Sequence, residues 1–273
     1  MRGFYKRVVT GIVIVGLSVG AVLLGPSFFF GFCLLVSVLG LWEFYRLFEV
    51  TRDRVRAIAG LLLSVSLLAS VFLVTMLRTG PEILSMNLPV ISFIFSTVLF
   101  TKTANPFSSL AYTFLGQAYI TLPFALLFLT PFALNGEWYH QRIVLGYFFL
   151  LWSNDSGAYA FGSLFGKTPL APVISPGKTW EGSAGGVLLT GVTVYILCRR
   201  FRDIESADWI VLGVIVVVLG TLGDLVKSVM KRNLHVKDSG TILPGHGGIL
   251  DRFDSMIGSV PFVFLYLSLV SSG

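Results

Sequence analysis

Residues 209–227 read WIVLGVIVVVLGTLGDLVK, a run of 19 residues with two charged side chains, Asp224 and Lys227. A helix that crosses a bilayer needs about 20 mostly apolar residues, so this run predicts a membrane-spanning helix. The rest of the chain has the same character: 55% of its 273 residues are hydrophobic, 12% are charged, and the mean hydropathy is +0.83. Soluble domains carry about 25% charged residues, so the composition indicates an integral membrane protein.

Similar apolar runs predict an all-α, polytopic integral membrane protein with about nine transmembrane helices. The turn Gly25-Pro26-Ser27 predicts that the first two helices form a hairpin. Pro123 predicts a kink in the fifth run, because proline cannot continue the hydrogen bonds of a helix. The first run lacks a cleavage site, so we expect a retained helix and not a signal peptide. The expected spans are approximately residues 8–25, 28–46, 57–77, 83–101, 109–133, 143–165, 182–198, 209–227 and 252–271.

Lysine and arginine gather between these runs, on one side of the predicted membrane. If the N-terminus is cytoplasmic, that side receives 15 of the 20 lysines and arginines, as the positive-inside rule requires. The loop 199–208 opposes this orientation with three arginines, although three carboxylates accompany them. The net charge of +6 therefore reflects membrane orientation, and we expect no nucleic-acid binding. Cys33 and Cys198 lie in apolar runs and predict neither a disulfide nor a metal site.

Pairs of glycines at helical spacing predict places where helices approach closely in lipid. No internal repeat is evident in the sequence, which argues against a transporter built from inverted repeats. The glycine pairs are Gly16/Gly20, Gly162/Gly166 and Gly182/Gly186.

A first polar cluster begins with Asn154 and Asp155 in the sixth run. A carboxylate within the membrane is costly enough to suggest function, although a structural, hydrogen-bonded carboxylate is the alternative. The segment Gly162–Thr168 resembles a Walker A loop, but it is one residue short and follows a helix where that motif follows a strand. We therefore reject a P-loop.

The loop after the sixth run nevertheless has groups that could hold anions. Lys167, Lys178 and the backbone amides around Ser175–Thr179 form this set, although the two lysines could instead be membrane-interface anchors. Thr179 or Ser183 is expected to cap the helix that follows.

A second cluster lies at the end of the eighth run. Lys227 and Ser228 follow Asp224 by three and four residues, so the three side chains share one helical face. A simple ion pair between Asp224 and Lys227 explains this pattern as well as a ligand-binding role does.

The third cluster lies in SVMKRNLHVKDSGTILPGHGGILDRFD, residues 228–254. Asp251 and Asp254 fall on one face of the ninth predicted helix; capping explains Asp251 but not a second aspartate beside it. Together with Asp224, these oxygens fit the way that Mg²⁺ is held, with room for water and phosphate. His246 could be a phosphate donor, a general acid or a structural residue. The remaining basic and glycine residues suit a phosphate site: Lys231, Arg232, Lys237, Gly245, Gly247 and Gly248.

The spacing of this third cluster resembles the signature of the phosphatidate cytidylyltransferases (CDP-diacylglycerol synthases). The matching pattern is Ser228-x-x-Lys231-Arg232-x4-Lys237-Asp238-x-Gly240-x2-Leu243-x2-His246-Gly247-Gly248-x2-Asp251-Arg252-x-Asp254. The segments from Asp155 to Lys167 and from Ile174 to Gly182 also resemble motifs of that family, which often has a lysine at the position of Gly177. The resemblance covers roughly residues 150–260.

The resemblance implies that CTP and phosphatidate give CDP-diacylglycerol and pyrophosphate, with Mg²⁺ and a possible second metal ion. Attack on the α-phosphorus would be in line, and the site would face the cytoplasm at the inner membrane of a cell, in a homodimer. Residues 1–105 would form a scaffold with oligomer contacts, and residues 106–273 would carry the active site. The implied catalytic residues are Asp224, Asp251, Asp254, Lys237 and His246, with the three aspartates as metal ligands. The implied substrate-binding residues are Asn154, Asp155, Lys167, Ser175, Lys178, Thr179, Lys227, Ser228, Lys231, Arg232, Asp238, Gly247, Gly248 and Arg252.

Two rival functions stay open. A polyprenol or phytol kinase would also use CTP, but it would release CDP and not pyrophosphate. An ion-coupled transporter would use Asp155 and Asp224 as a relay across the membrane. Transport predicts polar residues through many spans, whereas the first five contain almost no ionisable residue apart from Glu43 near one end.

Overall fold

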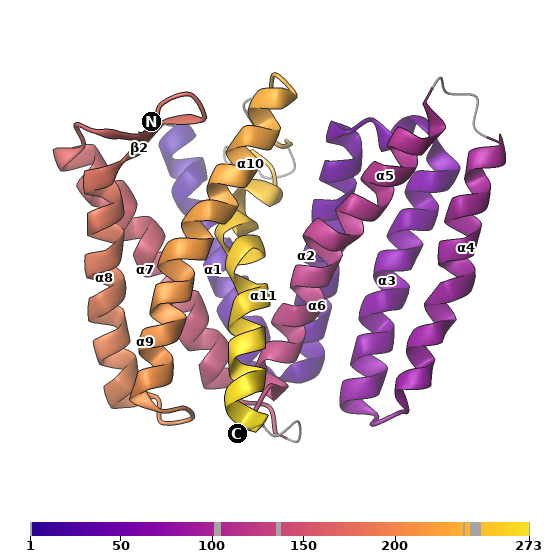
Figure 1. Cartoon of the computed structure of the whole chain (residues 1–273). Helices are drawn as coiled ribbons and strands as arrows, with labels where there is room; N and C mark the ends of the chain where they lie inside the picture. Colours follow the sequence, from indigo (N-terminus) through magenta and orange to yellow (C-terminus); the bar gives the residue numbers. More distant parts are fainter. Residues whose placement is uncertain (1, 101–104, 135–137, 237, 241–246, 273) are drawn as a thin grey trace. The chain divides into compact units, whose positions relative to one another are not determined.

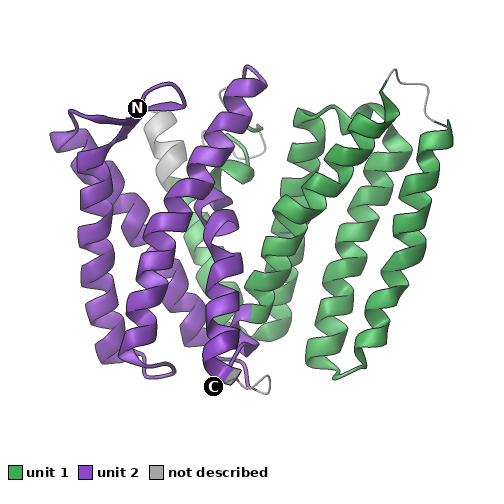
Figure 2. Ribbon diagram, viewed as in Figure 1, with its two compact units in different colours: residues 1–129, 238–252 green, residues 130–237, 253–273 purple. Residues whose placement is uncertain are grey.

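The computed structural model describes residues 2–100, 105–134, 138–236, 238–240 and 247–272. Helices dominate this part of the chain, because a backbone in lipid must satisfy its own N–H and C=O groups. The chain forms two compact units (Figures 1 and 2): unit 1 has residues 1–129 and 238–252, and unit 2 has residues 130–237 and 253–273. The functional division expected at residue 105 stays a prediction.

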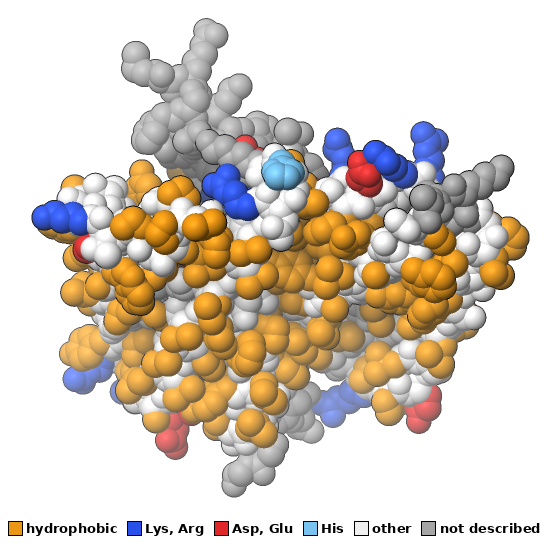
Figure 3. Space-filling model, turned by 45° about the horizontal axis from the view of Figure 1, so that its top comes forward, with side chains coloured by type: hydrophobic (Ala, Val, Ile, Leu, Met, Phe, Trp, Pro, Cys, Tyr) orange, Lys and Arg blue, Asp and Glu red, His pale blue; other side chains and the backbone are white. Residues whose placement is uncertain are grey.

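Seven helical segments of the described residues are long and apolar enough to cross a membrane. Two more helices, α1 (Arg2–Leu23) and α7 (Gln141–Phe165), match the first and sixth predicted spans. An all-α polytopic membrane protein is therefore confirmed, and each predicted span has a counterpart. Figure 3 shows hydrophobic side chains over most of the visible face and charged side chains toward its upper and lower margins. The seven segments are Pro26–Leu47, Arg54–Met76, Pro81–Phe100, Pro106–Phe132, Trp180–Arg200, Ser206–Asn233 and Leu250–Ser271.

Unit 1 contains the predicted N-terminal hairpin. Gly25 has a φ of 107°, a left-handed conformation that favours glycine, and Pro26 begins the second helix. A π-helical turn, η4, ends two residues before Pro123, so the helix is irregular where the proline predicted a kink. The helices of unit 1 are α1, α2 (Pro26–Leu47), η1 (Val50–Arg52), α3 (Arg54–Met76), η2 (Pro81–Asn87), α4 (Leu88–Ser96), η3 (Thr97–Phe100), α5 (Pro106–Gly116), η4 (Gln117–Thr121) and α6 (Leu122–Leu129).

A buried polar network joins α2, α3, α5 and η4 of unit 1. The Tyr45 hydroxyl donates to the Thr113 carbonyl (3.0 Å) and accepts from Gln117 Nε2 (3.0 Å). Gln117 Nε2 also donates to the Gly60 carbonyl at 2.7 Å. Polar groups away from water are costly when unpaired, so these bonds fix how the helices pack.

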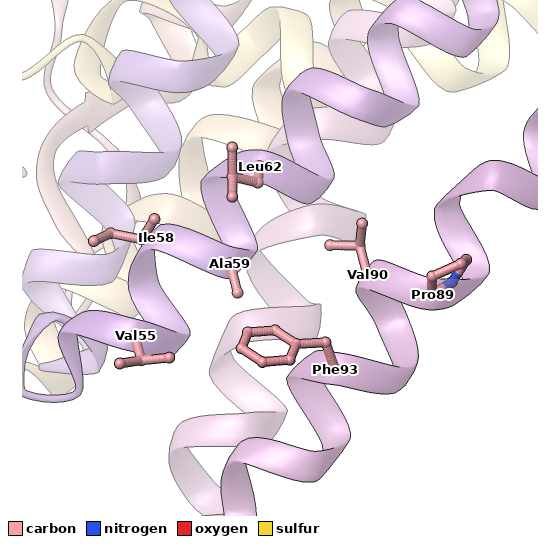
Figure 4. A pocket seen from close by; sticks show the side chains of 7 residues that line it. All are labelled: Val55, Ile58, Ala59, Leu62, Pro89, Val90 and Phe93. Carbon is pink, nitrogen blue, oxygen red and sulfur yellow. The ribbon is translucent and has the colours of Figure 1, made fainter.

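An apolar groove of about 500 Å³ lies between α3 and α4 (Figure 4). Its walls have no charged side chain, so it does not contribute to a phosphate site. The lining residues are Val55, Ile58, Ala59, Leu62, Pro89, Val90 and Phe93.

Unit 2 adds a feature that the sequence did not predict, a two-stranded antiparallel hairpin after α7. Pro169 pairs with Thr179 and Ala171 with Ser175. A second π-helical turn, η6, was also not predicted. The elements are η5 (Thr130–Phe132), α7, β1 (Pro169–Ala171), β2 (Ser175–Thr179), α8 (Trp180–Arg200), α9 (Ser206–Ile215), η6 (Val216–Gly220), α10 (Thr221–Asn233) and, from Phe253 on, α11 (Leu250–Ser272).

Glycines let α7 and α8 touch backbone to backbone. A Cβ at Gly182 would lie 2.8 Å from the Ala158 carbonyl oxygen, and one at Gly186 would lie 3.1 Å from the Asn154 carbonyl oxygen. The predicted close packing is therefore confirmed for the Gly182/Gly186 pair. It is wrong for Gly16/Gly20, where an added Cβ meets no described atom within 4 Å.

Candidate functional site

The site in unit 2 is built where α10 and α11 meet. A Cβ at Gly223 would lie 2.7 Å from the Asp254 carbonyl oxygen and 2.8 Å from Gly258 Cα. No residue larger than glycine fits this crossing without a shift of the backbone. The contact therefore sets Asp224, the next residue of α10, beside the first turns of α11.

Two ion pairs connect this crossing to its neighbours. Lys178 Nζ of β2 lies 2.7 Å from Asp224 Oδ2, and Lys227 Nζ lies 3.1 Å from Asp254 Oδ2. Lys227 is buried, with 1% of its side chain exposed, whereas Lys178 and Asp224 are 25% and 33% exposed. The sequence suggested a simple ion pair between Asp224 and Lys227. In the structure Asp224 pairs with Lys178 of β2, and Lys227 pairs with Asp254 of α11.

Asp155 brings a third carboxylate to the same place from α7. The Ser255 hydroxyl of α11 donates to Asp155 Oδ1 at 3.4 Å. Asp254 and Asp224 are close enough to repel the Asp155 carboxylate, while Lys178 attracts it. Three carboxylates and two ammonium groups therefore share one region of unit 2, with Asp155 and Asp224 partly accessible.

The hairpin and the start of α8 complete the predicted anion-binding loop. The Thr179 hydroxyl accepts the Gly182 amide at 3.1 Å, so the predicted N-cap is confirmed at Thr179. The Glu181 carboxylate accepts the backbone amides of Lys167 (3.2 Å) and Thr168 (3.1 Å). Arg232 Nε donates to the Ile174 carbonyl at 3.3 Å, which links α10 to the hairpin. Glu181, for which the sequence predicted no role, therefore accepts two of the backbone amides of this loop.

In unit 1, Asp251 organises the glycine-rich part of the motif. Asp251 Oδ2 accepts Ser239 N (3.0 Å), Ser239 Oγ (2.8 Å) and Gly248 N (3.2 Å). Gly247 has a φ of 83°, so its position requires a residue that tolerates the left-handed region. Asp251 is the second residue of α11, and Asp254 follows three residues later on the same helix.

The other predicted residues have these positions. Asn154 is buried against Gly186, and Ser175 is half-buried in β2. Ser228 and Lys231 are half-buried on α10, while Asp238 and Arg252 are exposed in unit 1. Lys237 and His246 lie outside the described residues, so their predicted roles stay predictions.

Three contributors to the contacts of this motif were missed: Glu43, whose Oε2 accepts Leu250 N at 3.0 Å, and the two serines Ser239 and Ser255. Glu43 had one visible signal, because it is an ionisable residue in an otherwise apolar span. Ser239 and Ser255 had no distinct signal, since a serine beside an aspartate is common in any loop or helix start.

A resident Mg²⁺ would have to fit this donor set. Among the residues that the structure describes, no group of three or more His, Cys, Asp or Glu side chains has metal-binding geometry. Mg²⁺ usually binds through one or two carboxylates, water and substrate phosphates, and not through a cage of protein ligands alone. Asp224 and Asp254, with Asp155 near them, supply oxygen ligands of this kind, so the donor set fits the ion.

Comparison with known proteins places this geometry in a family. Residues 5–270 match the model of the cytidylyltransferase family. A protein of Haemophilus influenzae named phosphatidate cytidylyltransferase is 32% identical over 280 residues, which cover 94% of this chain and 96% of the relative. Proteins of that name from Staphylococcus epidermidis and Staphylococcus aureus are each 41% identical over 68% of both chains. A match over nearly the full length, with the motif residues at the helix ends described above, shows that this chain belongs to the cytidylyltransferase family.

Proposed function

We propose that the protein transfers the cytidylyl group of CTP to phosphatidate and so produces CDP-diacylglycerol and pyrophosphate. The observation that carries the proposal is the charged region of unit 2, where the carboxylates Asp155, Asp224 and Asp254 meet Lys178 and Lys227. The names of the relatives support CTP and phosphatidate as the substrates.

The reaction requires no nucleophile from the protein. A phosphate oxygen of phosphatidate forms the new bond to the α-phosphorus of CTP, and the bond from that phosphorus to the β-phosphate oxygen breaks. Pyrophosphate leaves with the electron pair of that bond. Catalysis then depends on holding the two phosphates in line and on stabilising negative charge.

The basic residues around the crossing are suited to that task. Lys178 on β2 and Lys231 and Arg232 on α10 approach from accessible positions, and we assign them to the phosphates of CTP and lipid. Buried Lys227 holds Asp254 in place through its ion pair. Lys167, on the loop beside Glu181, would add positive charge.

Asp224 and Asp254 are the residues that would hold Mg²⁺, with Asp155 close to both. When bound, the ion would offset the charge of the pyrophosphate group. Asp251 remains a predicted ligand; its described bonds to Ser239 and Gly248 orient its carboxylate. A second metal ion, catalytic roles for Lys237 and His246, and substrate contacts from Asn154, Ser175, Thr179, Ser228, Asp238, Gly247, Gly248 and Arg252 are part of the same proposal.

We further propose that the site faces the cytoplasm at the inner membrane and that the protein is a homodimer. The excess of lysine and arginine on one side of the spans supports the orientation. The dimer rests on the resemblance to the family, and cross-linking in native membranes would test it.

The experiment compares purified wild-type protein with Asp224→Asn and Asp254→Asn in detergent micelles that contain phosphatidate. In both variants the rate of Mg²⁺-dependent CDP-diacylglycerol formation should fall at least about 100-fold, because each variant lacks one charged ligand. Glu82→Gln is the matched control, since Glu82 is an exposed carboxylate of unit 1. Near-wild-type turnover of both asparagine variants would remove the metal assignment.

A further inference from the structure

We infer that Glu43 is a positioning residue for the reaction, because its carboxylate fixes the glycine segment, defined as residues 238–240 and 247–252. The inference rests on the proposed function, since Asp251 of that segment is one of the proposed ligands. Glu43 itself does not have to contact a substrate.

Glu43 is buried in an otherwise apolar helix. It lies near the end of α2, and 2% of the residue is exposed. A carboxylate in such a place costs free energy unless hydrogen-bond donors surround it. The glycine segment supplies a donor: Leu250 N donates to Glu43 Oε2 at 3.0 Å. Because Leu250 is the first residue of α11, the carboxylate also lies where a helix N-terminus favours negative charge.

Two glycines of the segment are shaped around this carboxylate. A Cβ at Gly248 would lie 2.6 Å from Glu43 Oε2 and 2.9 Å from Gly240 N. A Cβ at Gly240 would overlap the Glu43 carboxylate itself. Both parts of the segment therefore pack against one buried side chain, and neither position has room for alanine.

The same segment orients Asp251. Ser239 N and Gly248 N both donate to Asp251 Oδ2, one from each part of the segment. Glu43 accepts from Leu250, the residue before Asp251, and its carboxylate lies against Gly248, one of these donors, and against Gly240, the residue after Ser239. Loss of the Glu43 carboxylate would free the two parts of the segment to shift and would misplace Asp251. Groups that orient ligands in this way typically change metal affinity or activity by about 10–100-fold when mutated.

A role in folding alone is the alternative, and the test separates the two. Glu43→Gln keeps the volume of the side chain and one carbonyl oxygen, but it removes the negative charge beside the Leu250 amide and replaces one carboxylate oxygen with an amide donor. We expect kcat/KM for CTP to fall about 10–100-fold and the Mg²⁺ concentration for half-maximal activity to rise. The melting temperature in detergent should fall by no more than a few degrees. Glu49→Gln, which alters an exposed glutamate that pairs with Arg52 at 2.6 Å, should behave as wild type.

A readout without activity distinguishes this inference from the proposed function. In a Cys198→Ser background, a cysteine introduced by Asp238→Cys should react faster with a thiol reagent when Glu43→Gln is also present. If Glu43→Gln speeds the labelling but the wild-type protein forms no CDP-diacylglycerol, the proposed function is refuted, while the role of Glu43 in fixing the glycine segment is supported. Unchanged labelling and unchanged Mg²⁺ dependence in Glu43→Gln would overturn the inference, as would activity lost only in proportion to unfolding.

Discussion

The buried ion pair between Lys227 and Asp254 gives the sharpest test of the site in unit 2. Lys227→Met removes the ammonium group from a side chain that is 1% exposed and leaves Asp254, 16% exposed, without that partner. At 3.1 Å and an effective dielectric constant of about 20, two unit charges attract by about 5 kcal/mol. Removal of one partner of a buried pair costs about 3–5 kcal/mol, and the partial exposure of Asp254 favours the lower end of that range.

We therefore expect Lys227→Met to lower the free energy of unfolding by about 3 kcal/mol, measured by denaturant titration in mixed micelles. The double variant Lys227→Met/Asp254→Asn should recover about 2 kcal/mol of that loss, because the uncompensated carboxylate is gone. It should stay inactive, since Asp254 is a proposed metal ligand. A Lys227→Met protein within about 1 kcal/mol of wild type, or a double variant less stable than the single one, would refute the reasoning.

Three further predictions concern the hairpin and the helix that follows it. Thr179→Ala should cost about 1 kcal/mol of unfolding free energy through loss of the α8 cap, whereas Ser183→Ala should cost little, as thermal unfolding would show. Gly185→Ala should destabilise by about 1–3 kcal/mol because its Cβ overlaps the side chain of Phe161, whereas Gly191→Ala, with open space around it, should be neutral or stabilising in the same assay. Lys178→Ala should raise KM for CTP by about 10-fold or more in steady-state kinetics, because a charge-assisted phosphate contact contributes about 1.5–3 kcal/mol; an unchanged KM would remove Lys178 from the phosphate site.

The spans could be predicted from sequence because length and hydropathy alone decide which segments cross a bilayer. The two π-helical turns, Gln117–Thr121 and Val216–Gly220, could not, since they depend on how a helix packs against its neighbours. The hairpin of Pro169–Ala171 and Ser175–Thr179 was missed for a different reason. Its strands are short and contain proline and glycine, so they lack the alternating pattern of a strand.

Within the site, the sequence named residue types but not their partners. Asp224 and Lys227 are neighbours on one helical face, which suggested a local pair. The structure connects Asp224 to Lys178, 46 positions earlier, and Lys227 to Asp254, 27 positions later. Such pairings depend on tertiary contacts, here the close approach at Gly223, that no local pattern encodes.

Transfer of the α-phosphorus of CTP to the lipid is the central step of the proposed reaction. Purified protein would be incubated with phosphatidate, Mg²⁺ and CTP labelled either at the α- or at the γ-phosphate, and the lipid and aqueous products would be separated. We expect label from the α-position in the lipid product and label from the γ-position in pyrophosphate. Label from the γ-position in the lipid, with release of CDP, would identify a lipid kinase and contradict the account.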